Sequence, residues 1–178
     1  MKFEPGLKAD SGRFALLWHE IPRHFRQDTA GGTLASHWDL LLEMDGPELL
    51  TFRLDVLPPT SLTNPPSWSH ANGATPPGML QEQATQMNQQ IPGLRLPNHR
   101  PLYLDYEGPI AGDRGTVQRI AAGTYHRLVH AQSVKNAPCE IVLASKELAA
   151  HLCLPPCEVG ETVLLDVLRF ERFQEVVE

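Results

Sequence analysis

The apolar residues of this chain are gathered in short segments that glycine and proline separate. These segments span 13–19, 36–46, 49–54, 100–108, 115–120, 122–128, 139–144 and 162–171. Apolar runs of this length, bounded by turn-forming residues, favour β-strands over helices. The dipeptide Asp45-Gly46 is typical of a tight β-hairpin turn. The sequence therefore predicts a mainly β fold, either an antiparallel β-barrel or a curved sandwich.

A polar, proline-rich stretch interrupts this pattern at about 57–97. We expect most of it to form a loop or an insertion, because repeated prolines are typical of irregular structure. Residues 78–90 within it contain no proline and are rich in good helix formers, and 146–152 is a second candidate helix. The sequence therefore predicts one or two short helices at these places.

The chain has 178 residues, of which 42% are hydrophobic, and this suits a single domain better than two small ones. No apolar run approaches the roughly 20 residues that cross a bilayer. The N-terminal residues carry charges where a secretion signal is apolar. The three cysteines provide no framework for a disulfide scaffold. We therefore expect one cytoplasmic domain over 1–178, without a membrane partner.

His37 and Asp39 are candidate metal ligands because alternate residues of a strand share one face. An imidazole beside a carboxylate suits manganese, iron or zinc, and a third ligand from a neighbouring strand would leave positions open for substrate. His19, at the end of the first apolar segment, is the best candidate for that ligand, and His24 is the alternative. A simple hydrogen-bonded His–Asp pair on the surface is the competing interpretation.

Five sequence blocks occur in order along the chain, at 14–19, 37–46, 99–108, 114–117 and 123–125. Together they resemble the successive blocks of the 3′-phosphoesterase domain of bacterial DNA ligase D, over residues 13 to 125 apart from the proline-rich stretch. The resemblance implies an antiparallel barrel with its site in a concave face. It also implies metal-dependent removal of a 3′-phosphate or a 3′-terminal ribonucleotide from a DNA end.

The resemblance further implies roles for individual residues. The family's metal ligands fall on His19, His37 and Asp39, and the resemblance implies a divalent metal there, manganese first and zinc or another transition metal second. The family's proton-handling or phosphate-contacting residues fall on His99 and Tyr103. The implied partners are a DNA 3′ end and a repair ligase or polymerase on a separate chain.

Two phosphate-binding arginines of the family are replaced in this chain. Leu41 stands in the place of the first, two residues after Asp39, and Ile91 stands in the place of the second. Leucine cannot substitute for arginine here, because the guanidinium pairs with two phosphate oxygens at once. We expect the positive charge to come from three other arginines: Arg95, Arg100 and Arg114.

Three functions follow from these observations. The first is a stand-alone, metal-dependent 3′-phosphoesterase that acts in DNA repair. The second is a catalytically weak relative that binds nucleic-acid ends or a protein partner, which the replaced arginines favour. The third is a hydrolase of small phosphate esters. The net charge of −6 favours this third function, because affinity for nucleic acid depends on Lys and Arg.

Overall fold

The structure is a computed structural model that describes residues 6–8, 10–22, 35–57, 85–128 and 137–172. The described strands are β1 (Ser11–Glu20), β2 (His37–Glu43), β3 (Leu49–Leu54), β4 (Thr85–His99), β5 (Gly108–Pro109), β6 (Thr116–Leu128), β7 (Cys139–Ala144), β8 (Leu148–Leu154) and β9 (Thr162–Arg172). One turn of 3-10 helix, η2 (Pro101–Leu104), follows β4.

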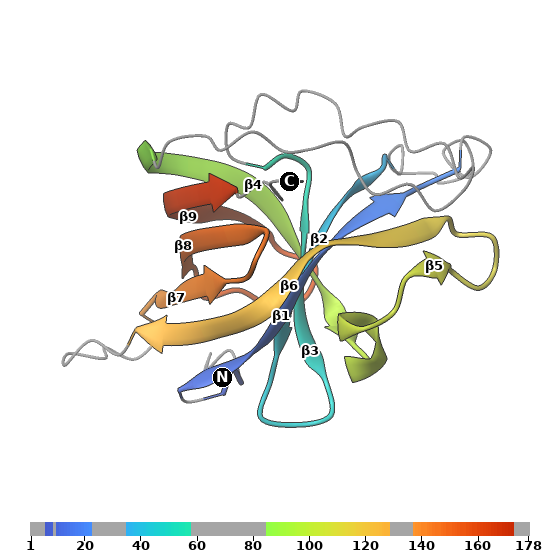
Figure 1. The fold of residues 1–178 in the computed structure, drawn as a ribbon, viewed down its shortest axis with the longest axis horizontal. Helices are drawn as coiled ribbons and strands as arrows, with labels where there is room; N and C mark the ends of the chain where they lie inside the picture. Colours follow the sequence, from blue (N-terminus) through green and yellow to red (C-terminus); the bar gives the residue numbers. More distant parts are fainter. Residues whose placement is uncertain (1–5, 9, 23–34, 58–84, 129–136, 173–178) are drawn as a thin grey trace, which may run out of the picture.

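Eight of these strands close into an antiparallel β-barrel, and β5 is one extra short strand (Figure 1). The strands lie in the order β1, β2, β3, β4, β9, β8, β7 and β6, and β6 pairs back with β1. Closure joins the two sides of the sheet, so the described strands leave no long edge that could pair with another chain. The predicted mainly β fold is confirmed, and of the two predicted architectures it is the barrel.

The interior of the barrel is filled by alternate residues of its strands. Phe14 and Leu16 come from β1, Leu40 from β2, Phe52 from β3 and Leu165 from β9, and each is at most 4% exposed. Burial of one such side chain contributes about 1.5–3 kcal/mol to folding. Because side chains alternate along a strand, the intervening residues of β1 and β2 point to the outside of the barrel.

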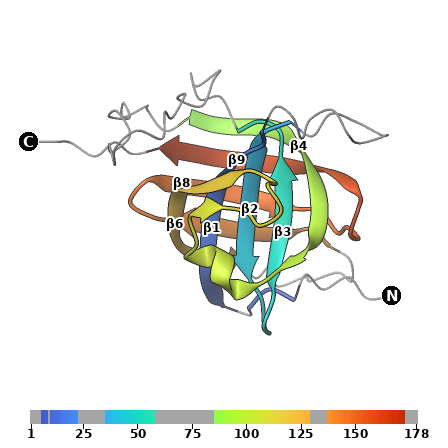
Figure 2. The same cartoon turned by 90° about the vertical axis from the view of Figure 1, so that its right-hand side faces the viewer.

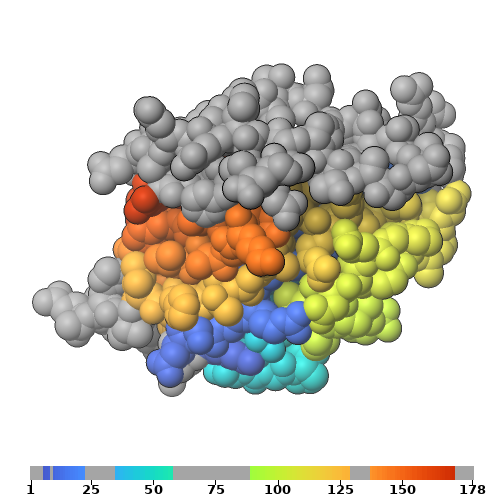
Figure 3. All heavy atoms as spheres, viewed as in Figure 1, coloured from blue at the N-terminus to red at the C-terminus, as the bar shows by residue number. Residues whose placement is uncertain are grey.

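The outer faces of β1 and β2 are also apolar near η2. A second buried cluster lies there: Ala15, Leu17, Leu41, Leu49, Leu104 and Val117. Figure 2 shows η2 in front of β1 and β2, and η2 contacts both strands. Figure 3 shows the residues of η2 and β5, in yellow-green, gathered on one side of the molecule. The apolar segment 100–108 therefore forms mainly a cover over the barrel wall.

The proline-rich stretch is shorter than the sequence predicted. Residues from Thr85 onward belong to β4, so the expected loop is wrong over 85–97, and the predicted helix 78–90 is wrong over 85–90. Residues 58–84 lie outside the described residues. β4 lies between β3 and β9 and closes the barrel, and this pairing outweighs the weak helical preference of Gln and Met.

β4 holds two prolines, Pro92 and Pro97, although proline is disfavoured in central strands. The register between β3 and β4 shifts between Leu49 and Thr51, and Pro97 lies in this β-bulge. Pro92 lies one residue beyond Gly93, the last β4 residue that pairs with β3. Both prolines thus occupy places where the ladder to β3 is broken or has ended.

The second predicted helix, at 146–152, is also wrong, because residues from Leu148 onward form β8. Buried and half-buried residues alternate along β8, which is the period of a strand between two neighbours. Ser145 begins the tight turn before it, since its Oγ accepts hydrogen bonds from the N–H groups of Glu147 and Leu148. Within the described part of the chain there is no α-helix, and no helix there is long and apolar enough to cross a membrane.

Candidate metal centre

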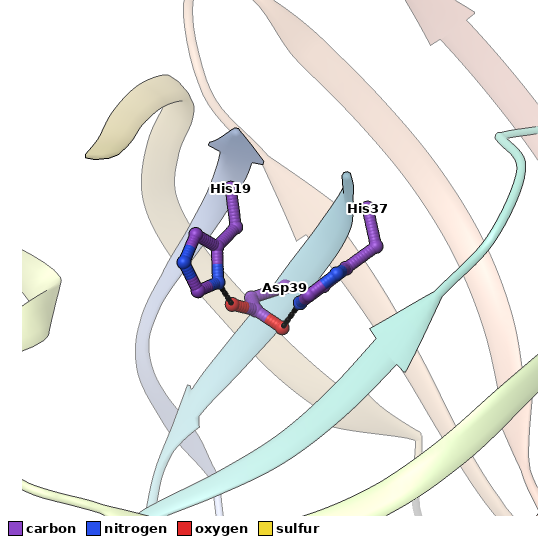
Figure 4. Close-up of side chains that lie close together, drawn as sticks. All are labelled: His19, His37 and Asp39. Carbon is purple, nitrogen blue, oxygen red and sulfur yellow. Dashed lines mark ion pairs between the residues drawn. The ribbon is translucent and has the colours of Figure 1, made fainter. Parts of the chain in front are cut away.

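Three predicted metal ligands lie together on the outer face of the barrel (Figure 4). His37 and Asp39 come from β2, and His19 lies near the end of β1, directly opposite His37 in the antiparallel ladder. Opposed residues of two strands share one face of the sheet. One possible ligand atom from each residue lies within 4.8 Å of the other two. We refer to these three residues as the triad.

The hydrogen bond of His37 to the main chain fixes which of its nitrogens faces Asp39. Nδ1 of His37 lies 2.8 Å from the carbonyl oxygen of Ala35. A carbonyl oxygen only accepts, so Nδ1 carries the hydrogen and Nε2 of the neutral ring presents a lone pair. Nε2 lies 3.5 Å from Oδ1 of Asp39, which is too far for a good hydrogen bond.

His19 has the same arrangement with its nitrogens exchanged. Its Nε2 lies 3.0 Å from the carbonyl oxygen of Arg114 and donates to it, so Nδ1 presents the lone pair. Nδ1 lies 3.7 Å from Oδ2 of Asp39. Metal-binding histidines are commonly oriented in this way, by a backbone carbonyl that accepts the hydrogen of the other ring nitrogen.

Gly115 allows the carbonyl of Arg114 to reach His19. Its φ of +107° is a conformation that residues with a Cβ rarely adopt, and an added Cβ would overlap the carbonyl oxygen of Glu20. The chain therefore passes close to the end of β1 only because residue 115 is glycine. This close approach positions the oxygen that orients His19.

The carboxylate of Asp39 is buried, and one of its oxygens has no hydrogen-bond partner among the described residues. Asp39 is 5% exposed, and within the described residues its Oδ1 has no hydrogen-bond partner. A buried oxygen of this kind is costly unless a donor or a cation contacts it. The three ligand atoms lie within 4.8 Å of one another, and ligands about 2.1 Å from one zinc-sized ion lie about 3.4 Å apart, so a small inward movement of the side chains would let them share one ion. The donor set and its spacing fit a divalent metal.

The pKa of His37 is lowered from its ordinary value, chiefly because burial disfavours the charged ring. The negative charge of Asp39 acts in the opposite direction, and the net shift is still downward. A neutral imidazole is the form that binds a metal. The environment of His37 therefore favours the ligand form of its side chain.

His99 and Tyr103, the predicted proton-handling pair, are neighbours. His99 ends β4 opposite Leu49, and Tyr103 lies in η2 with its ring centroid 5.6 Å from that of His99. Tyr103 packs on the outer apolar cluster that includes Leu41. Leu41 lies on the same face of β2 as Asp39, about 7 Å further along the strand. His37 begins β2, and Leu49 pairs with Glu43, which ends it, so His99 lies beside the opposite end of β2 from His37.

The two positions where the family has phosphate-binding arginines are both buried here. Leu41 is 1% exposed and lies in the cluster beneath η2. Ile91 is 2% exposed and lies in the barrel interior. Both side chains therefore have a packing role in this structure.

Arg95 is turned away from the triad. It stands opposite Phe52 in the ladder between β3 and β4, so it shares the interior face with that ring and is 6% exposed. Its guanidinium donates to the carbonyl oxygen of Thr51 at 3.2 Å, and also to Leu96 and Asn98. The prediction that Arg95 binds substrate receives no support from this position.

The other two predicted arginines lie on the outside. Arg100 is exposed, and its Cζ lies 6.0 Å from the ring centroid of Tyr103. Arg114 is also exposed, and its Nε donates to the carbonyl oxygen of Ala111 at 2.9 Å. It is the carbonyl of Arg114, and not its guanidinium, that the structure brings to the triad. Substrate binding by these two side chains stays a prediction.

One arginine beside the triad was missed in the sequence. Arg53 on β3 stands directly opposite Asp39, so both side chains lie on the outer face. Its positive charge is one of the causes that lower the pKa of His37. The predicted hairpin could have revealed this pairing, because Asp39 and Arg53 are equally distant along the chain from Gly46 at its turn, and such residues face each other in a hairpin.

Of the residues that carry the resemblance to the ligase D phosphoesterases, the structure brings His19, His37 and Asp39 together, whereas His99 lies at the level of Glu43, the last residue of β2. His24, the alternative third ligand, lies outside the described residues. A comparison of the sequence with protein-family models gives no match, and a comparison with curated proteins gives none either.

Proposed function

We propose that this protein is a metal-dependent phosphoesterase. Its first substrates would be DNA ends that carry a 3′-phosphate or a 3′-terminal ribonucleotide, and its metal would be manganese. One observation carries the proposal: two histidines give their N–H to backbone carbonyls and turn their lone pairs toward the buried carboxylate of Asp39. Lone pairs that face one another in a buried place call for a cation between them.

The donor set supports an open, catalytic kind of site. Two imidazoles and one carboxylate suit manganese, iron and zinc, and three protein ligands leave coordination positions for substrate. When bound, the metal supplies Lewis acidity toward a phosphoryl oxygen and lowers the pKa of water. His37 and Asp39 are each 5% exposed, and burial strengthens their electrostatic interactions with a bound charge.

The resemblance assigns proton handling to His99. Its Nδ1 lies 2.9 Å from the carbonyl oxygen of Pro97 and donates to it, which leaves Nε2 available to a substrate that extends along the outer face from the triad toward η2. Tyr103 would position the substrate, since its ring lies against His99 on one side and near Arg100 on the other.

Hydrolysis of small phosphate esters is the second candidate function. The net charge of −6 favours it, because a polyanionic substrate is repelled by an acidic protein. The order of the sequence blocks and the two exposed arginines, Arg100 and Arg114, favour a DNA end instead. Both substrate classes would use the same metal and the same histidines.

The test is incubation of the full chain with a 3′-phosphate oligonucleotide, a 3′-ribonucleotide oligonucleotide or p-nitrophenyl phosphate, each with manganese or with EDTA. We expect manganese-dependent product from the oligonucleotides and none from His37→Ala. His126→Ala is the matched control, because His126 is an exposed histidine on β6 outside the site. Turnover of p-nitrophenyl phosphate alone would support the second candidate. Metal binding without any turnover would overturn both in favour of a binding module.

A further inference from the structure

Arg53 occupies the position next to the triad from which an anion could be bound. It is the direct partner of Asp39 in the ladder between β2 and β3, and the Cβ atoms of such a pair lie about 4.5–5.5 Å apart. Its side chain is 20% exposed. The guanidinium thus lies beside the triad and remains reachable from solvent.

The present contacts of Arg53 are weak enough for its guanidinium to exchange them for a bound anion. Its Nε and Nη2 lie 3.1 and 3.0 Å from one oxygen, Oδ1 of Asp55, whose side chain is 60% exposed. A guanidinium has five N–H donors, so two of them share a single acceptor here. An exposed ion pair of this kind contributes little to stability and is easily exchanged for a stronger partner.

The rest of the site has no other arginine that the structure places beside Asp39 among the described residues. Leu41 and Ile91 are buried in apolar clusters, and the guanidinium of Arg95 is in the interior. A phosphoryl group carries two or three charged oxygens, and a metal ion contacts only some of them. An arginine that donates two parallel hydrogen bonds commonly binds the oxygens that the metal does not contact.

We propose that Arg53 is the anion-binding residue of this site and takes the phosphoryl oxygens that face β3. Asp55 holds the guanidinium in the absence of substrate and is displaced when the oxyanion enters. This inference rests on the proposed function, because it takes the triad to hold a metal. It assigns phosphate recognition to β3, whereas the two family arginines correspond to Leu41 on β2 and Ile91 on β4.

The test uses inorganic phosphate as the ligand and calorimetric titration of the manganese-loaded full chain as the measurement. Arg53→Met should weaken phosphate binding about tenfold to a hundredfold, the effect of losing one or two hydrogen bonds from a charged donor. Asp55→Asn should strengthen phosphate binding, because the competing carboxylate is gone. Arg53→Lys should bind phosphate with intermediate affinity, since lysine keeps the positive charge but cannot donate two parallel hydrogen bonds to two phosphate oxygens.

Manganese affinity separates this role from a structural one. Arg53→Met removes a positive charge close to the metal, so it should bind manganese at least as tightly as the unmodified chain. A variant that weakened manganese and phosphate binding together would show damage to the fold and overturn the assignment. Two controls change charge elsewhere on the barrel: Arg13→Met, at the far end of β1, and Asp45→Asn, in the β2–β3 turn. Both should leave phosphate affinity unchanged.

The outcomes distinguish this inference from the proposed function. If the unmodified chain binds manganese and phosphate, and Arg53→Met binds phosphate equally well, the role of Arg53 is wrong and the metal site stands. Manganese binding without phosphate binding in the unmodified chain would likewise show that Arg53 does not bind an anion here. If the unmodified chain binds no manganese, the proposed function fails and this inference fails with it.

Discussion

Nε2 of His37 lies 3.5 Å from Oδ1 of Asp39, and the hydrogen of the neutral imidazole is on the opposite side of the ring, toward Ala35. Two acceptors therefore face each other in a place where Asp39 is 5% exposed. This relationship is locally destabilising, and a cation between the two acceptors would relieve it. If the triad holds a metal, stability and metal affinity should therefore be coupled at Asp39.

Asp39→Asn should raise the stability of the protein in EDTA and lower its affinity for manganese. The amide can donate to Nε2 of His37, so the free energy of unfolding in EDTA should rise by about 1 kcal/mol. Loss of the charged ligand should remove the increase in melting temperature that manganese produces. Denaturation with EDTA and with manganese measures both effects. Asp45→Asn, on the exposed hairpin turn, is the control and should alter neither. A melting temperature of Asp39→Asn that still rises with manganese would show that Asp39 is not a ligand.

Gly115→Ala should lower the affinity of the triad for manganese, although Gly115 is not itself one of the three proposed ligands. The added Cβ overlaps the carbonyl of Glu20 and the φ is +107°, so the chain must move and the carbonyl of Arg114 leaves His19. We expect a loss of stability of about 1–3 kcal/mol and a loss of manganese affinity of about tenfold or more. Gly46→Ala is the matched control, because no atom lies within 4 Å of its added Cβ. Equal manganese affinities for the two variants would contradict the role given to the Arg114 carbonyl.

Leu41→Arg should destabilise the protein and should not improve catalysis. The substitution restores the residue of the ligase D family, but Leu41 is 1% exposed and lies beneath η2. A buried, unpaired guanidinium should cost about 3 kcal/mol or more and displace η2 with Tyr103. Leu164→Arg, at a position that is 52% exposed on β9, should change stability by less than about 0.5 kcal/mol. Urea unfolding compares the two variants, and a Leu41→Arg variant as stable as the unmodified chain would refute this packing argument.

Tyr125 should make the fold sensitive to alkaline pH. Burial is the largest cause that raises its pKa from 10.0 to about 12. Below about pH 10 the Tyr125 hydroxyl keeps its proton in both the folded and the unfolded chain, so the free energy of unfolding does not depend on this group. Between about pH 10 and 12 only the unfolded chain loses this proton, and the free energy of unfolding falls by as much as about 3 kcal/mol.

Tyr125→Phe tests this dependence. Its hydroxyl donates to the carbonyl of Glu43 at 2.5 Å and accepts from the N–H of Lys8 at 3.0 Å. Phenylalanine should therefore cost about 1–3 kcal/mol near neutral pH and abolish this part of the alkaline decline. Urea unfolding at pH 8 and pH 11 measures both. Tyr103→Phe, whose ring is outside the barrel interior, is the comparison and should keep the decline.

Much of the fold is local in origin and could be predicted. The segments 49–54 and 139–144 match β3 and β7, and Asp45-Gly46 lies at the hairpin turn. The shared face of His37 and Asp39 follows from the period of a strand alone. These features depend on neighbours in sequence, which a pattern of residues records directly.

The errors fall where the neighbours are distant in sequence. The Gln-rich start of β4 and the segment Leu148–Leu154 have residues that also suit helices, and pairing with β9 and β7 makes them strands. The face on which Arg95 points depends on its register with Phe52. Neither the partners nor the register can be read from local composition.

By itself, then, the sequence determined that the chain forms antiparallel strands and that one of them presents an imidazole and a carboxylate on one face. The sequence also named His19 as the best third ligand, but only the tertiary structure placed it opposite His37 and added the Arg114 carbonyl that orients it and Arg53 opposite Asp39. The reason is physical, because a metal or phosphate site is defined by distances between side chains. Those distances are set by barrel closure and strand register.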